Sequence, residues 1–331
     1  MADPATVIFE QVAAAPADPG ADIVPRRPLI VVDGFLPMEL AAAMREDIDR
    51  HFAGSYANSP ETHQVWNYLF APQLYTYLQT SPEKIIGGDR VADFCDALKS
   101  WSIGTLGMGR MSGPDLDFYA AGCSQGFYNE PQGGRFGFVY SLTRDARRTV
   151  GGDTLVMREG DPFRAHLTSP AAQHGFCDIV EPRFNRLLVF DDRLMRAVSR
   201  LEGSMDPVEG RFVLHGHLTE AGTMIGGALP REAVARPIDF LLKTFAIDAA
   251  ARIALHRGVL SIRLLVEPSG SVAACDVLID RVIHPDPDDV EWEHLRDDLV
   301  GRFRMLNFAP APGETVVIQP IVFGGALPSL G

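Results

Sequence analysis

Two histidines at alternate positions are the clearest candidates for chemistry. His215 and His217 close the run Arg211-Phe-Val-Leu-His-Gly-His. Side chains two residues apart on a strand point to the same face. The two imidazoles could therefore bind one metal ion, with Asp191 or Asp192 as a carboxylate partner. Because paired histidines in a strand more often serve packing and hydrogen bonding, a metal site at His215 and His217 is the weaker alternative.

A second pair of reactive types is His174 and Cys177, which would suit a thiol nucleophile activated by an imidazole. Closeness in sequence does not establish catalytic geometry, and this segment is predicted to be a loop that enters a strand. The other cysteines, Cys95, Cys123 and Cys275, complete no C-x-x-C pair and show no zinc-like spacing. We expect reduced thiols, without a disulfide framework or a structural metal.

A strand and a helix are predicted at the start of the chain. Pro28–Val32 is an apolar run of strand length, and a turn follows it. Leu40, Met44 and Ile48 recur every four residues, which marks one face of a helix over residues 38–52. The chain therefore opens with a strand followed by a helix.

Residues 91–106 predict a second helix. We interpret the aromatic runs at 65–70 and 74–78 as core packing, with a wall that faces a substrate as the weaker alternative. From Leu116 the pattern changes to apolar runs of strand length, separated by Gly, Pro, Asp and Asn. Such spacing is typical of an all-β sandwich or barrel. The predicted strands are residues 116–119, 136–142, 154–157, 186–190 and 211–218.

A different pattern follows a Gly-rich segment, residues 222–230, which we interpret as a linker. Helices are predicted near 231–256 and 290–303, and strands at 260–266, 272–279 and 315–323. This mixture indicates a small α+β domain. We therefore divide the chain near residue 225 into an N-terminal lead, 1–27, a β-rich domain, 28–224, and a C-terminal domain, 225–331.

Five short segments of the β-rich domain resemble, in order, the prolyl-4-hydroxylase-like branch of the iron(II)/2-oxoglutarate oxygenases. They are Phe118–Gly122, Arg135–Thr143, Gly151–Thr154, Asn185–Leu194 and Gly210–Gly216. Each segment is weak alone, but five in the right order are specific for a fold. The resemblance implies a double-stranded β-helix, or jelly-roll, core with flanking helices. With the small C-terminal domain, the fold class is α+β.

The resemblance fails at the residues that would hold iron. In that family a His-x-Asp pair and a distal histidine bind the metal. The segment where the pair belongs, Cys123–Arg135, contains no histidine. The register that retains a carboxylate puts Tyr128 and Glu130 on the two positions, and a shift of one residue gives Phe127 and Asn129. Neither register supplies the usual ligands.

The resemblance places Arg196 where the distal histidine belongs. A guanidinium offers no lone pair and stays protonated in proteins. At about 4 Å and an effective dielectric near 20, it would oppose a divalent ion by about 8 kcal/mol. We therefore expect no bound iron, and we predict an ion pair between Arg196 and Glu130. The remaining alternative is that His166 or His174 enters the site from a loop.

Arg211 and Tyr119 are the candidates for a 2-oxoglutarate pocket, because the resemblance assigns Arg211 to the distal carboxylate of that cosubstrate. A structural ion pair of Arg211 is an equal alternative once iron is gone. We thus expect no metal cofactor and keep 2-oxoglutarate as a candidate ligand.

The C-terminal domain resembles the TonB carboxy-terminal domain family in Leu260–Val266, in the turn Pro268–Val272, and in Phe303–Gly313 leading into Val316–Phe323. In that family the domain binds protein partners, often through a strand edge. No transmembrane anchor or proline-rich spacer precedes it, so the energy-coupling role is not implied. We expect a docking or self-associating module.

The charge of the whole chain limits its partners. A net charge of −13 and a pI near 5.1 disfavour nucleic acid. The first twenty residues carry acids and prolines instead of the features of a signal peptide, and no apolar run is long enough to span a membrane. We expect a cytoplasmic protein that binds neither nucleic acid nor membrane.

Two functional hypotheses follow. The first is a metal-free relative of the oxygenases that binds a small molecule or peptide in the barrel cavity, or acts as a partner protein through its second domain. The second is an enzyme of altered chemistry. It would use Tyr128, Glu130 and Arg196 for metal-independent acid/base catalysis, or would hold relocated iron at His215 and His217.

Overall fold

The computed structural model describes residues 28–53, 65–131, 133–146, 148–158, 176–284 and 290–324. The N-terminal lead and both alternative histidines, His166 and His174, lie outside these ranges. The chain divides into two compact units, which we describe separately. The first contains Pro28–Leu98 and Met111–Leu218, and the second contains Lys99–Arg110 and the chain from Thr219.

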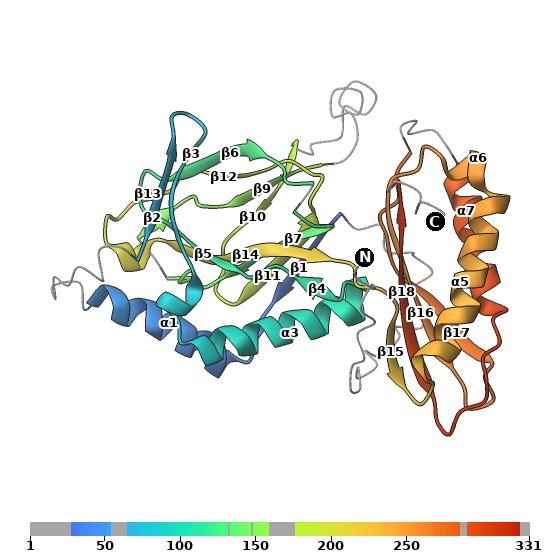
Figure 1. Ribbon diagram of the computed structural model, residues 1–331. Helices are drawn as coiled ribbons and strands as arrows, with labels where there is room; N and C mark the ends of the chain where they lie inside the picture. Colours follow the sequence, from blue (N-terminus) through green and yellow to red (C-terminus); the bar gives the residue numbers. More distant parts are fainter. Residues whose placement is uncertain are drawn as a thin grey trace. The chain divides into compact units, whose positions relative to one another are not determined.

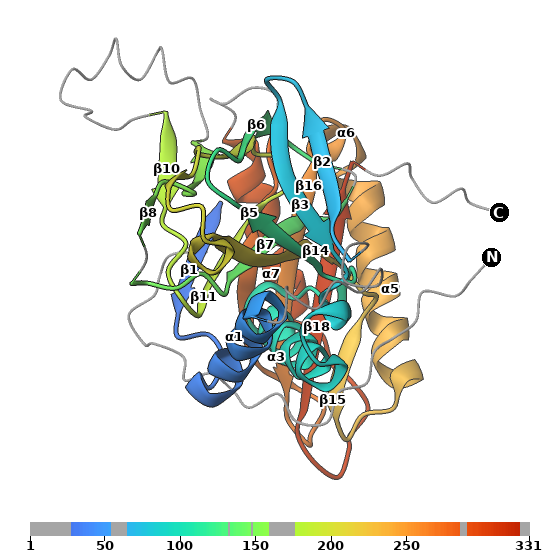
Figure 2. The same cartoon turned by 90° about the vertical axis from the view of Figure 1, so that its left-hand side faces the viewer.

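The first unit is built on a strongly curled antiparallel sheet of the jelly-roll type (Figures 1 and 2). Its strands run in the spatial order β1 (Leu29–Asp33), β11 (Arg186–Asp191), β7 (Phe136–Ser141), β14 (Arg211–Thr219), β5 (Asp115–Tyr119), β3 (Tyr75–Thr80), β6 (Ser124–Tyr128), β12 (Arg196–Val198), β9 (Thr154–Met157) and β10 (Cys177–Val180). The sheet is completed by β2 (Asn67–Ala71) beside β3 and β4 (Arg110–Met111) beside β14, and β8 (Thr149–Val150) forms a separate ribbon with β13 (Glu202–Gly203). The five strands predicted between residues 116 and 218 are confirmed.

Two helices lie along one side of this sheet, α1 (Met38–Ala53) and the first part of α3 (Gly88–Leu106) (Figure 1). Met44 and Ile48 are fully buried, as the four-residue spacing predicts. Between helix and sheet, the rings of Phe94 and Tyr140 lie 5.0 Å apart. Burial of these large apolar side chains holds the helices to the sheet.

The interpretation of both aromatic runs as core packing is wrong for the outer face of the β2–β3 hairpin. Tyr68, Phe70 and Leu74 are 62%, 56% and 63% exposed. Only the inner face packs as expected, because the ring of Tyr77 stacks on Tyr119 at 5.1 Å. Alternation sends neighbouring side chains to opposite faces of a strand, and no described element covers the outer face.

The second unit has a four-stranded antiparallel sheet in the order β15 (Met224–Gly227), β18 (Thr315–Phe323), β16 (Gly258–Val266) and β17 (Val272–Asp280). The helices α5 (Arg231–Asp248), α6 (Ala250–Ile253) and α7 (Glu291–Arg304) cover one face of it (Figure 1). The core joins apolar residues of sheet and helices, among them Ile262, Leu264, Val234, Leu295 and Phe303.

The strands and helices predicted between residues 231 and 323 are present, although the first helix ends at Asp248 and a short one follows. The segment interpreted as a linker, residues 222–230, contains strand β15, which pairs with β18. Its glycines and its four-residue length hid it from pattern reasoning. Among the described residues, no helix has both the length and the apolar character needed to cross a membrane.

Candidate functional site

Two neighbouring strands bring the predicted site residues together. Arg196 on β12 pairs across the ladder with Tyr128 on β6. Glu130 follows β6, and Asp192 follows β11. His217 lies on β14, which is separated from β6 in the sheet by β5 and β3. The fold thus gathers residues from four separate segments of the chain around one guanidinium.

Arg196 is 5% exposed and is held on every side. Its Nη2 lies 2.6 Å from Glu130 Oε2, so the ion pair predicted from the sequence is present. Its Nε donates a hydrogen bond of 3.2 Å to the Tyr128 hydroxyl. The guanidinium carbon lies 4.4 Å from the centre of the Tyr128 ring and 4.9 Å from that of Phe190. Cation–π contacts of this kind favour the charged form.

Asp192 is the second carboxylate beside Arg196, and its contact is weaker than that of Glu130. Its Oδ1 lies 3.5 Å from Arg196 Nη1, which is an ion pair without a hydrogen bond, and neither of these two atoms has another hydrogen-bond partner. Burial raises the pKa of Asp192 above its usual value, although His217 and Arg196 oppose that shift.

His217 bridges the two carboxylates. Its Nδ1 lies 2.7 Å from Asp192 Oδ2, and its Nε2 lies 3.3 Å from Glu130 Oε2. The hydrogen bonds to Asp192 and then to Glu130 raise the pKa of His217 to about 9. The hydrogen bond from His217, followed by the charge of Arg196, lowers the pKa of Glu130 to about 2. The cluster therefore contains two cations and two carboxylates in contact.

A glycine makes this contact possible. A Cβ atom built on Gly133 would lie 2.7 Å from His217 Cε1, closer than real Cβ atoms approach other atoms. The chain after Glu130 can therefore lie against the imidazole only because residue 133 has no side chain.

These residues do not fit a ferrous ion. Arg196 has no lone pair, and an imidazolium at His217 has none either. The relocated site at His215 and His217 does not converge, because His215 faces Asp117 while His217 faces Asp192 and Glu130. Within the described ranges, no group of three His, Cys, Asp or Glu side chains is arranged to hold a metal ion.

Arg211 lies in the same cavity but in a different environment. It is 2% exposed, its Nη2 donates to Thr154 Oγ1 at 3.0 Å, and its guanidinium carbon lies 4.8 Å from the Tyr119 ring centre. Its Nε has no hydrogen-bond partner, and no described carboxylate forms an ion pair with it. The structural ion pair considered as an alternative for Arg211 is therefore absent among the described residues.

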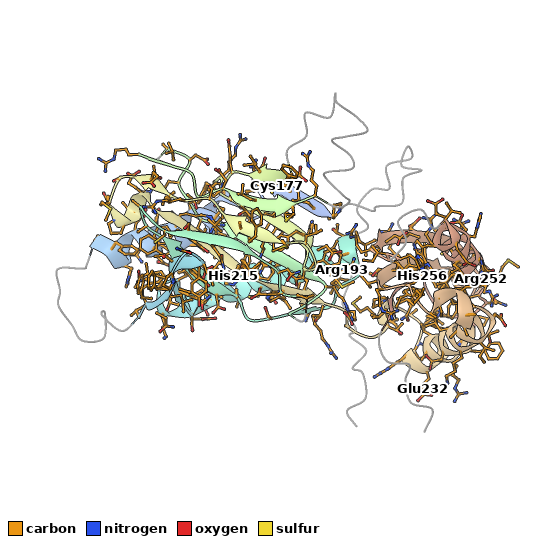
Figure 3. The ribbon with its side chains drawn as sticks, turned by 90° about the horizontal axis from the view of Figure 1, so that it is seen from above. Cys177, Arg193, His215, Glu232, Arg252 and His256 are labelled. Carbon is orange, nitrogen blue, oxygen red and sulfur yellow. The ribbon has the colours of Figure 1, made fainter. Side chains whose placement is uncertain are left out.

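Asp117 is an acidic group in the lining of this cavity, and the charges of both His215 and Arg211 act on it. Its Oδ2 lies 3.2 Å from His215 Nδ1, at an angle that does not make a hydrogen bond, and its Oδ1 accepts from Gln79 at 3.1 Å. Burial raises the pKa of Asp117. His215 lies among the strands of the first unit (Figure 3).

The cavity between these groups is small. Its lining includes Tyr119, Tyr128, Arg196, Arg211 and His215, and its free volume is about 20 Å³. That volume accommodates about one water molecule. Cys177 lies on the edge strand β10 and is not part of the lining, and its proposed partner His174 lies outside the described residues.

Sequence reasoning missed Asp117 and the role of Asp192. Asp117 is a charged residue inside an apolar strand, between Leu116 and Phe118, and it shares a face with Tyr119. A lone carboxylate at a buried strand position is a usable signal of a polar cavity. Asp192 was considered only as a metal ligand, whereas the structure pairs it with His217.

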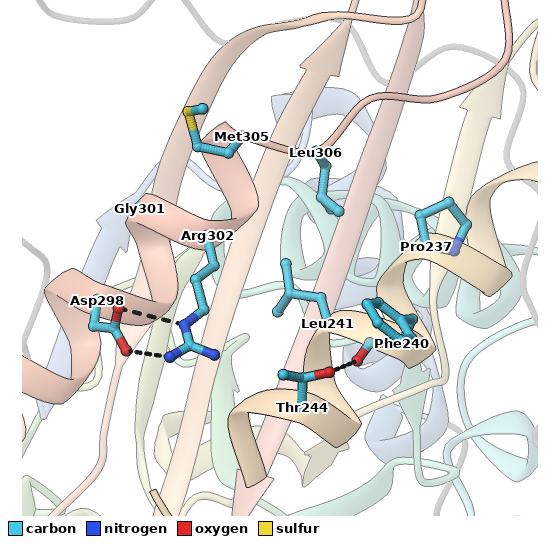
Figure 4. Close-up of a pocket in the computed structure, with 9 residues that line it drawn as sticks. All are labelled: Pro237, Phe240, Leu241, Thr244, Asp298, Gly301, Arg302, Met305 and Leu306. Carbon is cyan, nitrogen blue, oxygen red and sulfur yellow. Dashed lines mark hydrogen bonds and ion pairs between the residues drawn. The ribbon is translucent and has the colours of Figure 1, made fainter. Parts of the chain in front are cut away.

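The second unit contains an apolar groove between α5 and α7 (Figure 4). Its volume is about 520 Å³. Phe240 and Met305 line it and are 74% and 85% exposed, and Arg302 at its margin is paired with Asp298. No contact among the described residues indicates what, if anything, occupies it.

No protein-family model and no curated protein matches the sequence. Many solved structures are similar to this chain, and three of them match over 58% of it. They are a Trichoplax adhaerens prolyl hydroxylase in complex with a hypoxia inducible factor oxygen degradation domain peptide (12% identity, TM-score 0.42, 84% of that chain), a Pseudomonas putida prolyl-4-hydroxylase (15%, 0.40, 92%) and the non-heme alpha ketoglutarate dependent epimerase SnoN from nogalamycin biosynthesis (12%, 0.41, 77%). Similarity at this level transfers no activity, ligand or site residue to this chain.

Proposed function

We propose that the first unit is a metal-independent binding domain for a small carboxylate, and that it is not an oxygenase. The observation that carries this proposal is the guanidinium of Arg211, which is buried and forms no ion pair with a described carboxylate; Asp117 in the same cavity acts on it only at longer range. A buried charge that no close counter-ion compensates is costly, and a ligand of opposite charge would offset that cost.

The surroundings of Arg211 support a carboxylate ligand. Thr154 and the Tyr119 ring fix the guanidinium plane, while Nε still has a hydrogen to donate. A planar guanidinium binds carboxylates with paired hydrogen bonds. Asp117 lies beside His215 and acts on Arg211 only at longer range, so no close counter-charge occupies the guanidinium of Arg211. Because the free volume fits about one water molecule, side chains such as Gln125 must move to admit anything larger.

The fit of Arg196 with its partners supports the absence of oxygenase chemistry. Its guanidinium, between Glu130, Tyr128 and Asp192, takes the place that the resemblance gives to a metal ligand. We propose 2-oxoglutarate as the first ligand to test and dicarboxylates of similar length as the next. Acid/base catalysis by Tyr128, Glu130 and Arg196 has less support, because the three groups are engaged with one another.

The test is a thermal shift of the full chain in the presence of a chelator. We expect 2-oxoglutarate or succinate to raise the melting temperature of the wild type and to leave Arg211→Met unchanged. An equal response of the two proteins, or none at millimolar ligand, would refute the binding proposal. Stoichiometric iron in the purified protein, together with oxygen-dependent formation of succinate from 2-oxoglutarate, would refute the non-oxygenase proposal.

Partner binding by the second unit, which its likeness to the TonB carboxy-terminal family suggested, stays a proposal. It is supported by the apolar lining of the groove between α5 and α7. A cytoplasmic location likewise stays a proposal from the sequence.

A further inference from the structure

Strand β2 of the first unit has one unpaired edge. It pairs with β3 from Asn67 opposite Gln79 to Ala71 opposite Tyr75, and no described strand lies on its other side. The hairpin extends past the neighbouring strands of its sheet (Figures 1 and 2). An exposed edge offers free N–H and C=O groups to a further strand.

The usual protection of such an edge is missing. Proteins guard edge strands with charges, prolines or bulges, but residues 62–82 contain no Asp, Glu, Lys or Arg. The prolines of this stretch, Pro72 and Pro82, lie outside β2, and its ladder with β3 is regular. Among the described residues, no strand pairs with this edge at any point along its length.

Charge indicates which partner this edge suits. Each copy of the chain has a net charge of −13, so two copies repel over most of their surfaces. The hairpin is a part of the first unit where a second copy can approach without bringing like charges into contact. A strongly charged partner would gain nothing here, because the hairpin offers no opposite charge.

The side chains of β2 are complementary to themselves. Tyr68 and Phe70 lie on the same face, with ring centres 6.0 Å apart and planes at 6°. If two copies of β2 pair antiparallel about Leu69, Tyr68 of each copy lies opposite Phe70 of the other. Cross-strand aromatic pairs stabilise antiparallel ladders, and this register creates two of them.

We propose that the protein forms a symmetric dimer by antiparallel pairing of β2 with β2 of a second copy, centred on Leu69. The contact is isologous, so it closes on itself and does not propagate. Five residues per strand make a small interface, which predicts a weak dimer with a dissociation constant on the order of 10 μM. The proposal does not depend on the carboxylate site.

The test is sedimentation velocity of the full chain over a range of concentration from about 1 to 200 μM, bracketing that constant. We expect the wild type to dimerise within this range. In Tyr68→Glu/Phe70→Glu, like charges would face each other twice across the ladder. We expect its dissociation constant to rise at least about tenfold.

A charge-swapped variant tests the register. In Tyr68→Lys/Phe70→Glu, each lysine would lie opposite a glutamate of the second copy, so dimerisation should persist and weaken with added salt. Circular dichroism of both variants checks that the unit remains folded. Equal loss of the dimer in the two folded variants would overturn the proposed pairing.

The matched control lies in the second unit. Met305 is 85% exposed and lines the α5–α7 groove, so Met305→Glu adds a charge to an apolar surface outside the hairpin. We expect the dissociation constant of the Met305→Glu dimer to equal that of the wild type. Dissociation by Met305→Glu would overturn the proposal in favour of the groove. A wild type that stays monomeric at 200 μM would overturn it without favouring either surface.

Discussion

Two buried arginines of the first unit line one cavity but differ in how closely carboxylates approach them. Arg196 contacts two carboxylates and two aromatic rings, whereas Arg211 contacts one hydroxyl and one ring. Both are at most 5% exposed. Burial alone therefore does not distinguish them, but the presence of compensating charge does.

The difference shows how a buried arginine that stabilises the fold can be distinguished from one that is available to bind a ligand. A guanidinium inside a closed network contributes to stability only together with its partners, and removal of one member leaves the others unpaired. A guanidinium without partners costs stability in the free protein and repays that cost when an anion binds. The two arginines should therefore respond differently to the same substitution.

The largest expected effect is that of Arg196→Met. This substitution leaves two carboxylates, Glu130 and the buried Asp192, with His217 as their one remaining cation in the cluster, and we expect a loss of about 3 kcal/mol in the free energy of unfolding. Urea denaturation measures it. The matched control is Arg200→Met, because Arg200 is 63% exposed and pairs with an exposed Glu202. That variant should change stability by less than about 0.5 kcal/mol. Similar losses in the two variants would show that the Arg196 network contributes little.

The next effect concerns the backbone that closes the network. Gly133→Ala would put a methyl group 2.7 Å from His217 Cε1, and we expect a loss of about 2 kcal/mol as the imidazole is displaced. Gly113→Ala is the control, because a Cβ there meets nothing within 4 Å. An equal effect of the two substitutions in urea denaturation would contradict the close approach.

The network also makes stability depend on pH. His217 has a folded-state pKa of about 9, above the usual value of 6.5. The stabilisation that protonated His217 gives to the folded state is therefore complete below about pH 6.5. It disappears as the pH rises to about 9, because the unfolded chain releases the proton at a lower pH than the folded chain does. We expect the stability advantage of the wild type over His217→Gln to shrink by about 2 kcal/mol across this window. An advantage independent of pH would mean that His217 is neutral in the folded protein.

The Arg196–Glu130 pair was predictable because opposite charges stand at two positions that a family pattern brings together. The place of His217 was not, because its partners depend on how β14 lies beside the loop after β6, which no local pattern encodes. The same limit applies to the hairpin. Alternation predicts which side chains of residues 65–78 share a face, but whether another element covers that face is decided by the packing of distant segments.

The jelly-roll strands were predictable where apolar runs are long and separated by turns, as in Phe136–Ser141. The short strands β6, β12 and β15 were missed because their residues are polar, few or glycine-rich. Two of them, β6 and β12, hold Tyr128 and Arg196. Sequence therefore indicated the residues of the site better than the elements that position them.

The smallest effect on the free energy of unfolding is expected at Arg211, and it is the most direct test of the difference between Arg211 and Arg196. Arg211→Met removes a buried charge that forms no ion pair and keeps an apolar chain against the Tyr119 ring, so we expect the free energy of unfolding to change by less than about 1 kcal/mol in either direction. Urea denaturation without ligand measures this change beside that of Arg196→Met. A loss as large as that of Arg196→Met would mean that Arg211 is held by compensating charge in the free protein. Arg211 would then be a structural residue, and the carboxylate site would lose its main support.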